Sequence, residues 1–334
     1  MKLTRREFVT ASAALLSANW LNADDPNSRK IAIVLAPSNL GLRPNENGTQ
    51  QGTWRAPKAL MDAGLEKELN AVEVIAFDRP KYEFDAQPGT RIRNGNTIRA
   101  FTLQLSEKIN ELLKKNEFPV VIGGDCSILL GGLYASRLAG GRGLIHIDGH
   151  SDFSHPGNYD TKSRLGSVAG MDLALASGRG EDLLTAWPKV DKPLAADADI
   201  IQIGERNAES PYYKDYYGDI LRTEIKMFKI QNILADGISA TAEKAIARLQ
   251  ERGLNKVWAH VDLDVLDEKV MPAVDSPGSP GLNFAQLSEL IIVLLSSNRI
   301  AGINFAIYDP ERDPGIRHAE TLVKCIAAGL RSKI

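Results

Sequence analysis

The chain of 334 residues is 43% hydrophobic and 25% charged, which is the composition of an ordinary globular protein. Its net charge of −2 and its isoelectric point near 6.3 exclude the strong basic bias expected of a protein whose main partner is a nucleic acid or an anionic membrane. No apolar run reaches the roughly 18 residues needed to cross a bilayer, so we expect no membrane span.

Residues 1–23, MKLTRREFVTASAALLSANWLNA, are typical of a twin-arginine type export signal. Lys2, Arg5 and Arg6 give a basic start, Phe8 follows the arginine pair, and a weakly apolar stretch rich in Ala, Ser and Leu comes next. The alternative is an amphipathic helix with a chance arginine pair. The candidate cleavage tripeptides, LSA and LNA, both match the small-x-Ala pattern poorly. We predict an exported protein, in the periplasm or another extracytoplasmic space.

Short apolar segments that predict β-strands recur along the rest of the chain, at 30–36, 71–77, 118–124, 142–148, 198–204, 256–262 and 300–308. Between them, apolar residues at three- and four-residue spacing predict helices at 100–116, 241–253 and 284–298. Strands that alternate with helices indicate a mainly parallel sheet with helices on both faces. We see no linker or repeat, and we predict a single α/β domain over residues 30–334.

Polar segments follow three of the predicted strands: GGDCS (123–127), DGHSD (148–152) and VDLDVLD (261–267). In parallel sheets the ligand site lies at the carboxyl ends of the strands. We therefore expect these three segments to meet in one site.

The segment DGHSD favours a metal site. Asp148, His150 and Asp152 alternate with small residues, so an extended backbone places all three side chains on one side. Two carboxylates and an imidazole on one side suit Mn²⁺, Zn²⁺ or Fe²⁺, whereas Mg²⁺ and Ca²⁺ prefer oxygen throughout. The alternative, a solvated polar turn, fits poorly with the apolar strand GLIHI that leads into it.

Asp262 and Asp264 repeat this pattern after another strand. Together the two segments supply four carboxylates and one imidazole, enough to hold two divalent ions with bridging carboxylates. Two ions roughly 3.5–4 Å apart can share one water and make it a hydroxide at neutral pH. The residues therefore predict a hydrolase.

Cys126 has three possible roles: metal ligand, nucleophile or small buried residue. Cys126 and Cys325 are the only cysteines in the sequence, too few for a disulfide framework. Nothing in the GGDCS segment supplies a base aimed at the thiol, so a nucleophile is the least favoured role. We favour ligation because Cys126 follows a strand beside the other two polar segments.

These motifs resemble, in order, the metal motifs of the arginase/agmatinase (ureohydrolase) family. The family's GGDHS, DAHxD and [ST]xDxDxxDP patterns correspond to GGDCS, DGHSD and HVDLDVLDE, and similarity extends over residues 30–334. The resemblance implies cleavage of guanidino groups to urea and an amine with two Mn²⁺ ions. It also implies a three-layer αβα sandwich around a mainly parallel, roughly eight-stranded sheet, and a homo-oligomer, either a trimer or a hexamer.

The resemblance implies a role for each candidate ligand. Asp148 and Asp262 would bridge the two ions, Cys126 and Asp152 would complete one ion's ligands, and His150 and Asp264 the other's. A hydroxide bridging the ions would attack the amidine carbon, and Asp152 would help to pass its proton to the departing amine. Mn²⁺ is the expected ion, with Zn²⁺ or Fe²⁺ as alternatives because Cys126 replaces the family's usual histidine.

Three departures from the family pattern bear on the substrate, a small guanidino or amidine compound. Cys126 also occurs in a branch that resembles N-omega-hydroxyarginine hydrolases. Ala169 stands where arginases have a proton-shuttling histidine, and Ile307 where many members have an acid that binds the guanidinium. These losses argue against plain arginine or agmatine as substrate. The alternatives are a formiminoglutamase-like amidine hydrolase and a non-catalytic exported binding protein.

Four further residues are candidates for supporting roles. His146 and His260 each lie two residues before a motif aspartate, and His260, which replaces the family's Ser or Thr, is expected to contact a metal-binding carboxylate. His155 is a candidate replacement for the missing proton shuttle. Glu209 is a candidate substrate contact, because the corresponding loop of relatives contacts the substrate's amino-acid end.

Overall fold

The computed structural model describes residues 29–207 and 219–331. Residues 1–23, where an export signal is predicted, and Glu209 lie outside the described residues. Within the described part, no helix is long and apolar enough to cross a bilayer.

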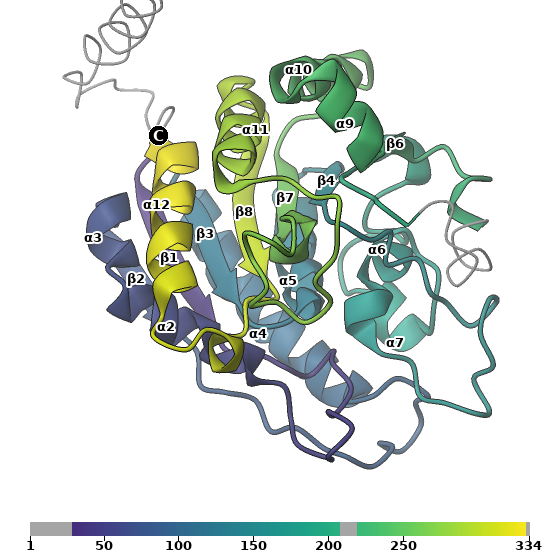
Figure 1. The fold of residues 1–334 in the computed structure, drawn as a ribbon. Helices are drawn as coiled ribbons and strands as arrows, with labels where there is room; N and C mark the ends of the chain where they lie inside the picture. Colours follow the sequence, from purple (N-terminus) through teal and green to yellow (C-terminus); the bar gives the residue numbers. More distant parts are fainter. Residues whose placement is uncertain (1–28, 208–218, 332–334) are drawn as a thin grey trace, which may run out of the picture.

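One eight-stranded sheet runs through the middle of the molecule, with the strands in the order β2-β1-β3-β8-β7-β4-β5-β6 (Figure 1). All neighbouring strands are parallel. The strands are β1 (Ile31–Ala36), β2 (Glu73–Ala76), β3 (Phe118–Gly123), β4 (Leu144–Ile147), β5 (Ile200–Ile203), β6 (Lys226–Phe228), β7 (Val257–Asp262) and β8 (Ile300–Ala306). The predicted fold class is confirmed, with a sheet that is wholly rather than mainly parallel.

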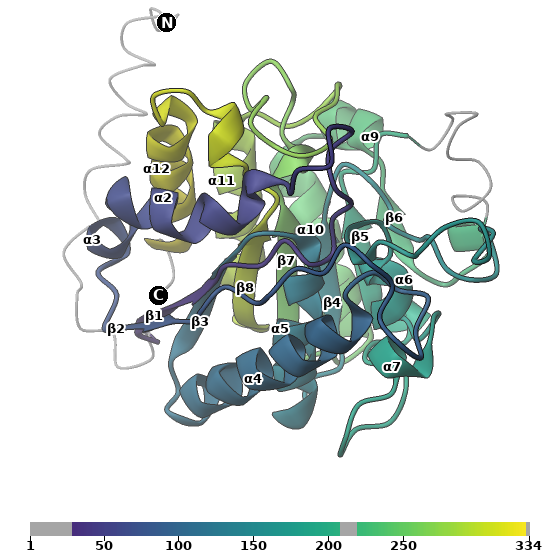
Figure 2. The same ribbon diagram turned by 90° about the horizontal axis from the view of Figure 1, so that it is seen from below.

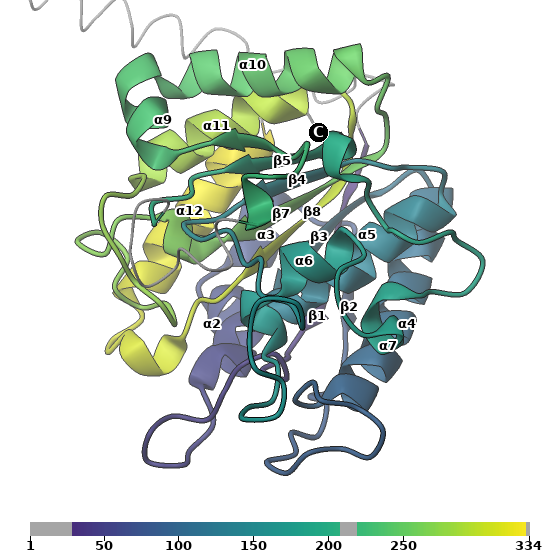
Figure 3. The ribbon, with the colours of Figure 1, turned by 90° about the vertical axis from the view of Figure 1, so that its right-hand side faces the viewer.

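Helices cover both faces of the sheet and complete the three layers (Figures 2 and 3). One layer contains α4 (Gly95–Lys114), α5 (Leu129–Leu138), α6 (Asp172–Ala176) and α7 (Asp182–Thr185). The other contains α2 (Ala56–Asp62), α3 (Leu65–Leu69), α9 (Ile230–Asp236), α10 (Ile238–Glu251), α11 (Phe284–Ser296) and α12 (Arg317–Arg331). The three helices predicted from apolar spacing correspond to α4, α10 and α11.

Local sequence explains where these elements begin and what they bury. Helix α11 starts with a capping box, in which Asn283 and Gln286 each accept a hydrogen bond from the other's backbone N–H, at 2.9 and 2.8 Å. The central strands β3, β4, β7 and β8 are buried along their whole length, as expected for a sheet covered on both faces.

Trp258 of β7 fills the space between the sheet and α5. A Cβ atom added to Gly132 of α5 would lie 2.1 Å from the indole ring, and one added to Gly302 of β8 would lie 2.5 Å from it. Both positions therefore need glycine to admit the ring. The indole Nε1–H donates a hydrogen bond of 2.7 Å to Oδ1 of Asn304, which connects this packing to the polar residues described below.

The sheet order brings the three polar segments to its centre. Strands β3, β8, β7 and β4 are consecutive neighbours, and GGDCS, VDLDVLD and DGHSD follow β3, β7 and β4. Short 3-10 turns after β3 (Cys126–Ile128) and β7 (Leu263–Val265) hold two of the segments in place. The three polar segments thus lie together at the carboxyl ends of the central strands, as predicted.

Candidate metal centre

The three polar segments are built on the same turn. In each, an aspartate side chain accepts a hydrogen bond from the backbone N–H two residues later, an arrangement in which short aspartate side chains stabilise turns. The pairs are Asp125 with Ser127 at 2.8 Å, Asp148 with His150 at 2.6 Å and Asp262 with Asp264 at 2.8 Å. These turns direct the side chains after the strands toward a common centre.

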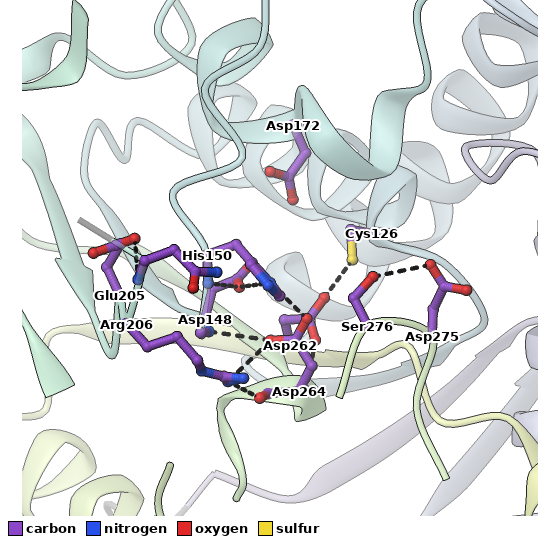
Figure 4. A network of polar contacts seen from close by, with 12 residues as sticks. Cys126, Asp148, His150, Asp172, Glu205, Arg206, Asp262, Asp264, Asp275 and Ser276 are labelled. Atoms are coloured by element: carbon purple, nitrogen blue, oxygen red, sulfur yellow. Dashed lines mark hydrogen bonds and ion pairs between the residues drawn. The ribbon is translucent and has the colours of Figure 1, made fainter. Parts of the chain in front are cut away.

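The structure brings all six candidate ligands together, and Figure 4 shows five of them: Cys126, Asp148, His150, Asp262 and Asp264. The Cys126 thiol points at the centre, with Sγ 2.7 Å from Oδ2 of Asp262, and His150 Nδ1 lies 2.8 Å from Oδ2 of Asp264. Ligand atoms of two triplets each lie within 4.8 Å of one another: Asp148, His150 and Asp264, and Asp148, Asp152 and Asp262. Two divalent ions can therefore be held side by side with Asp148 common to both groups.

Burial makes this cluster unfavourable without a cation. Burial and the neighbouring carboxylates raise the pKa of Asp152 and of Asp262 well above the usual range, and burial likewise raises the pKa of the Cys126 thiol. Oδ2 of Asp148 is buried without a hydrogen-bond partner. Several carboxylates with an imidazole and a thiol form a donor set that fits divalent transition-metal ions.

Asp264 behaves differently from the other carboxylates because positive charge surrounds it. Although burial acts to raise its pKa, His150 and Arg206 lower it to about 2. The Arg206 guanidinium lies 3.6 Å from Oδ1 of Asp264 and also donates to the Asp264 carbonyl oxygen. Arg206 was not singled out from the sequence, since only its place after β5 in the segment IQIGERN could have indicated it.

Gly149 makes room for Arg206. A Cβ atom at position 149 would lie 1.7 Å from Nη2 of Arg206, a distance that forces the guanidinium to move.

The Gly149→Ala variant is expected to displace Arg206 from Asp264 and to weaken Mn²⁺ binding roughly 10-fold, the lower end of losses seen for partners of metal ligands. Isothermal titration calorimetry measures the change. Gly170→Ala is the matched control, because a Cβ there meets nothing within 4 Å; equal losses in the two variants would contradict this role of Gly149.

Three further buried polar residues, His146, His260 and Asp172, form a cluster next to the candidate ligands. His146 Nε2 is 3.3 Å from Oδ1 of Asp172, and His260 Nε2 is 3.5 Å from Oδ2 of the same carboxylate. The two imidazole rings stack with their centroids 5.1 Å apart, because they occupy paired positions of β4 and β7. The carboxylate nearest to Nε2 of His260 among these contacts is therefore that of Asp172, a residue that the sequence does not single out.

A chain of hydrogen bonds fixes the protonation of His260. The indole N–H of Trp258 can only donate, so the Asn304 atom that faces it is the carbonyl oxygen. The Asn304 amide group then donates to Nδ1 of His260 at 2.6 Å. His260 is consequently neutral with its proton on Nε2, in agreement with a pKa that burial lowers well below the usual value.

A cavity of about 500 Å³ opens above the candidate ligands, a size suited to a small molecule. His150, Asp152, Asp262 and Asp264 reach its lining. Ala169 and Ile307 also line it, so the positions of the missing shuttle and the missing acid face the cavity as expected.

Two acidic residues that are not among the candidate ligands also line the cavity. Glu205, after β5, and Asp275, in the loop after β7, both line it. Burial raises the pKa of Asp275, whose carboxylate lies 3.8 Å from the Arg312 guanidinium. The cavity therefore has carboxylates near which a cationic substrate can bind, even though Ile307 stands at the position of the family's acid.

Two non-glycine residues of the cavity lining have left-handed backbone. Asp152 has φ of 41° and Ile307 has φ of 75°, a rare conformation for a β-branched residue. The backbone N–H of Ile307 donates a hydrogen bond of 2.6 Å to the Gly124 carbonyl oxygen, which holds Ile307 in this conformation. Strained backbone of this kind is concentrated at functional sites.

His155 does not join the site, contrary to the candidate role as a proton shuttle. Its Nδ1 accepts a hydrogen bond of 3.1 Å from the Gly157 N–H, and its Nε2 faces Asp219 at 3.3 Å. Both ring nitrogens are therefore engaged away from the cluster, and His155 is absent from the described residues that line the cavity. The geometry gives no support for a shuttle at this position.

Comparisons with known proteins agree with the geometry. The Arginase family model matches residues 29–329. The chain is 27% identical to the arginase of Staphylococcus aureus (strain COL) over 313 residues, covering 90% of this chain and 96% of that protein. Its fold is similar to that of the arginase of Bacillus caldovelox, with a TM-score of 0.75 and 24% identity over 90% of this chain and 98% of that one. A formiminoglutamase of Trypanosoma cruzi, solved with Mn²⁺, is similar in fold with a TM-score of 0.64 and 16% identity, covering 95% of this chain and 96% of that one.

Proposed function

Because the chain belongs to the arginase family, we propose that it is a dinuclear-metal amidinohydrolase that cleaves a C–N bond of a small guanidino-like compound and releases urea and an amine. The observation that carries the proposal is the convergence of six ligand side chains beneath a cavity of about 500 Å³.

We assign the six candidate ligands to two ions. Asp148 has close neighbours in both ligand groups, and we expect Asp148 and Asp262 to contact both ions, as the family resemblance implies. Cys126 and Asp152 would complete the ligands of one ion, and His150 and Asp264 those of the other. We expect Mn²⁺, by analogy with the Mn²⁺ of the T. cruzi formiminoglutamase, with Zn²⁺ or Fe²⁺ as alternatives because Cys126 contributes sulfur. When bound, such a pair of ions lowers the pKa of a shared water and supplies a hydroxide nucleophile.

The chain's own groups would bind the substrate and move its proton. Asp152 reaches the cavity lining beside the candidate ligands and can hand a proton to the departing amine. Glu205 and Asp275 offer negative charge to a cationic guanidinium, and Ile307 gives an apolar surface for its planar face. These groups support a guanidine-type substrate.

Turnover by metal-loaded protein tests the function. Protein reconstituted with Mn²⁺ should release an amine and urea from a guanidino compound, or an amine and hydroxyurea from a hydroxyguanidino compound, in a panel that also contains formimino compounds. Fewer than one bound metal per chain, together with no C–N cleavage product from any of them, would refute the proposal.

A formiminoglutamase-like amidine hydrolase is the second candidate, favoured by Ile307 at the position of the missing guanidinium-binding acid. The product distinguishes the two, because a formimino compound yields formamide rather than urea. A non-catalytic binding protein of the same fold is favoured only by the absence of a shuttle at Ala169 and His155, and it predicts binding without turnover.

Metal binding is expected to tighten as the pH rises. A cation needs the deprotonated forms of Asp152, Asp262 and Cys126, whose pKa values burial raises. Protons therefore compete with the ion increasingly as the pH falls through these raised values. Calorimetric Mn²⁺ titrations between about pH 6 and 8, in buffers of different ionisation enthalpy, measure both the affinity and the protons released. A constant affinity without proton release would contradict this prediction.

We also propose export through residues 1–23 and assembly into a trimer or hexamer. Replacement of Arg5 and Arg6 by lysine should retain the protein in the cytoplasm, whereas unchanged export would exclude a twin-arginine route. Light scattering of the purified protein measures the assembly, and a monomeric mass would exclude it.

A further inference from the structure

Asp172 is a buried carboxylate that the proposed function does not use. It is the first residue of α6, and its side chain is completely buried. Its carboxylate points toward the candidate metal centre from the layer of α5, α6 and α7 (Figure 4). Ligand atoms of Asp172, Cys126 and Asp152 lie within 4.8 Å of one another, as close as those of the sets already described.

One oxygen of this carboxylate has capacity for a ligand. Oδ1 faces His146 Nε2 at 3.3 Å, whereas Oδ2 is buried and has no hydrogen-bond partner. His260 Nε2 approaches Oδ2 only to 3.5 Å, without the geometry of a hydrogen bond. A fully buried carboxylate oxygen left in this state is costly unless a cation or a donor completes it.

His260 is not a ligand of that cation, although its imidazole is close enough to suggest it. The hydrogen bonds from Trp258 through Asn304 hold the proton of His260 on Nε2, the nitrogen that faces Asp172. A metal-binding nitrogen must be free of its proton. His260 therefore faces Oδ2 of Asp172 with an N–H group and cannot be a ligand there, while His146 Nε2 contacts Oδ1 of the same carboxylate at 3.3 Å.

We propose that Asp172 is a ligand of the same ion as Cys126 and Asp152. The proposal rests on the metal centre of the proposed function and adds a carboxylate to the side where cysteine replaces the family's usual histidine. The two ions then have unlike surroundings: sulfur and carboxylates around one, and imidazole and carboxylates around the other. Ions that accept both sulfur and oxygen, such as Zn²⁺, Fe²⁺ and Co²⁺, suit the first position.

Co²⁺ titration of the metal-free full chain tests the proposal without substrate. Binding at the first position should give a near-ultraviolet sulfur-to-cobalt absorption band. In Asp172→Asn this band should require at least ~10-fold more Co²⁺, the smallest loss expected even for a partner of a metal ligand. Superimposable titrations of the wild type and the variant would overturn the proposal.

Two matched variants separate ligation from support of the fold. His260→Gln removes the imidazole beside Asp172 but leaves the carboxylate, so the sulfur band should appear at about the wild-type Co²⁺ concentration. A requirement for as much additional Co²⁺ as in Asp172→Asn would overturn ligation in favour of a structural role. Asp264→Asn should lose the other ion and keep the band.

If Asp172→Asn does not fold, Asp172→Glu moves the carboxylate outward and should shift the band. An unchanged band and affinity would overturn the proposal. None of these readouts needs turnover. A protein that shows them but cleaves no compound of the panel would therefore support Asp172 as a ligand and favour the non-catalytic binding protein over the hydrolase.

Discussion

Replacement of Asp262 by asparagine is expected to lower kcat/KM by at least ~100-fold, the upper end of losses caused by removing a mere partner of a metal ligand. Asp262 has three contacts that bear on the site: its Oδ1 closes the turn to Asp264, its Oδ2 accepts from the Cys126 thiol, and its carboxylate lies close to those of Asp148 and Asp152. Asparagine can still accept the turn's hydrogen bond but lacks the charge that a bridging ligand supplies. Steady-state kinetics, with metal content measured on the same preparation, give the result.

Asp199→Asn is the matched control for this variant. Asp199 is also a buried aspartate, but it lies at the amino end of β5, whereas the candidate ligands follow the carboxyl ends of their strands. It pairs with Arg252 at 2.9 Å. It should keep its metal and its activity. Loss of metal without loss of function in Asp262→Asn would instead identify a binding protein that does not depend on the ions.

Replacement of Trp258 by alanine is expected to reduce the free energy of unfolding by about 3–5 kcal/mol, the usual range for removing a buried tryptophan ring. Gly132 and Gly302 leave open space that only the ring fills, and helix and strand backbones cannot collapse into it easily. Urea denaturation followed by circular dichroism measures the loss. A change below about 1 kcal/mol would show that the packing around the ring is loose.

Trp258→Phe separates packing from the hydrogen bond. Phenylalanine fills most of the space but leaves Oδ1 of Asn304 without its donor, at a cost of about 1–3 kcal/mol. Asn304 is then free to rotate its amide, so the proton of His260 is no longer fixed on Nε2. This variant should therefore alter Co²⁺ binding at the Cys126 side more than its stability loss suggests, whereas Trp258→Ala combines both effects.

The sequence predicts the fold and the gathering of the candidate ligands well because both depend on local pattern. Apolar runs indicate seven of the eight strands of the sheet, and polar residues at two-residue spacing indicate the side chains of DGHSD and VDLD that the structure brings together. The residues of strand β6 do not indicate a strand, because β6 is only three residues long, begins with an exposed lysine and pairs with a single neighbour, β5. Cys126 was placed correctly beside the carboxylates because it follows a strand directly.

The parts that the sequence did not indicate depend on contacts between distant segments. Asp172 lies in a short apolar helix with no polar neighbour in sequence, and its partners come from β4 and β7. Arg206 reaches Asp264 only because Gly149 has no side chain. His155 shows the opposite case: it is near the candidate ligands in sequence, but Asp219 and the Gly157 N–H engage its ring away from the cluster.

The shared turn of the polar segments has a consequence for the order of folding and loading. In Asp148 and Asp262 one carboxylate oxygen closes the turn, and the other is left facing the centre. The loops thus acquire their shape from hydrogen bonds within the protein before any ion arrives. Because the loops are already ordered, little of an ion's binding free energy is needed to order the chain. The apoprotein can therefore fold completely before it binds metal.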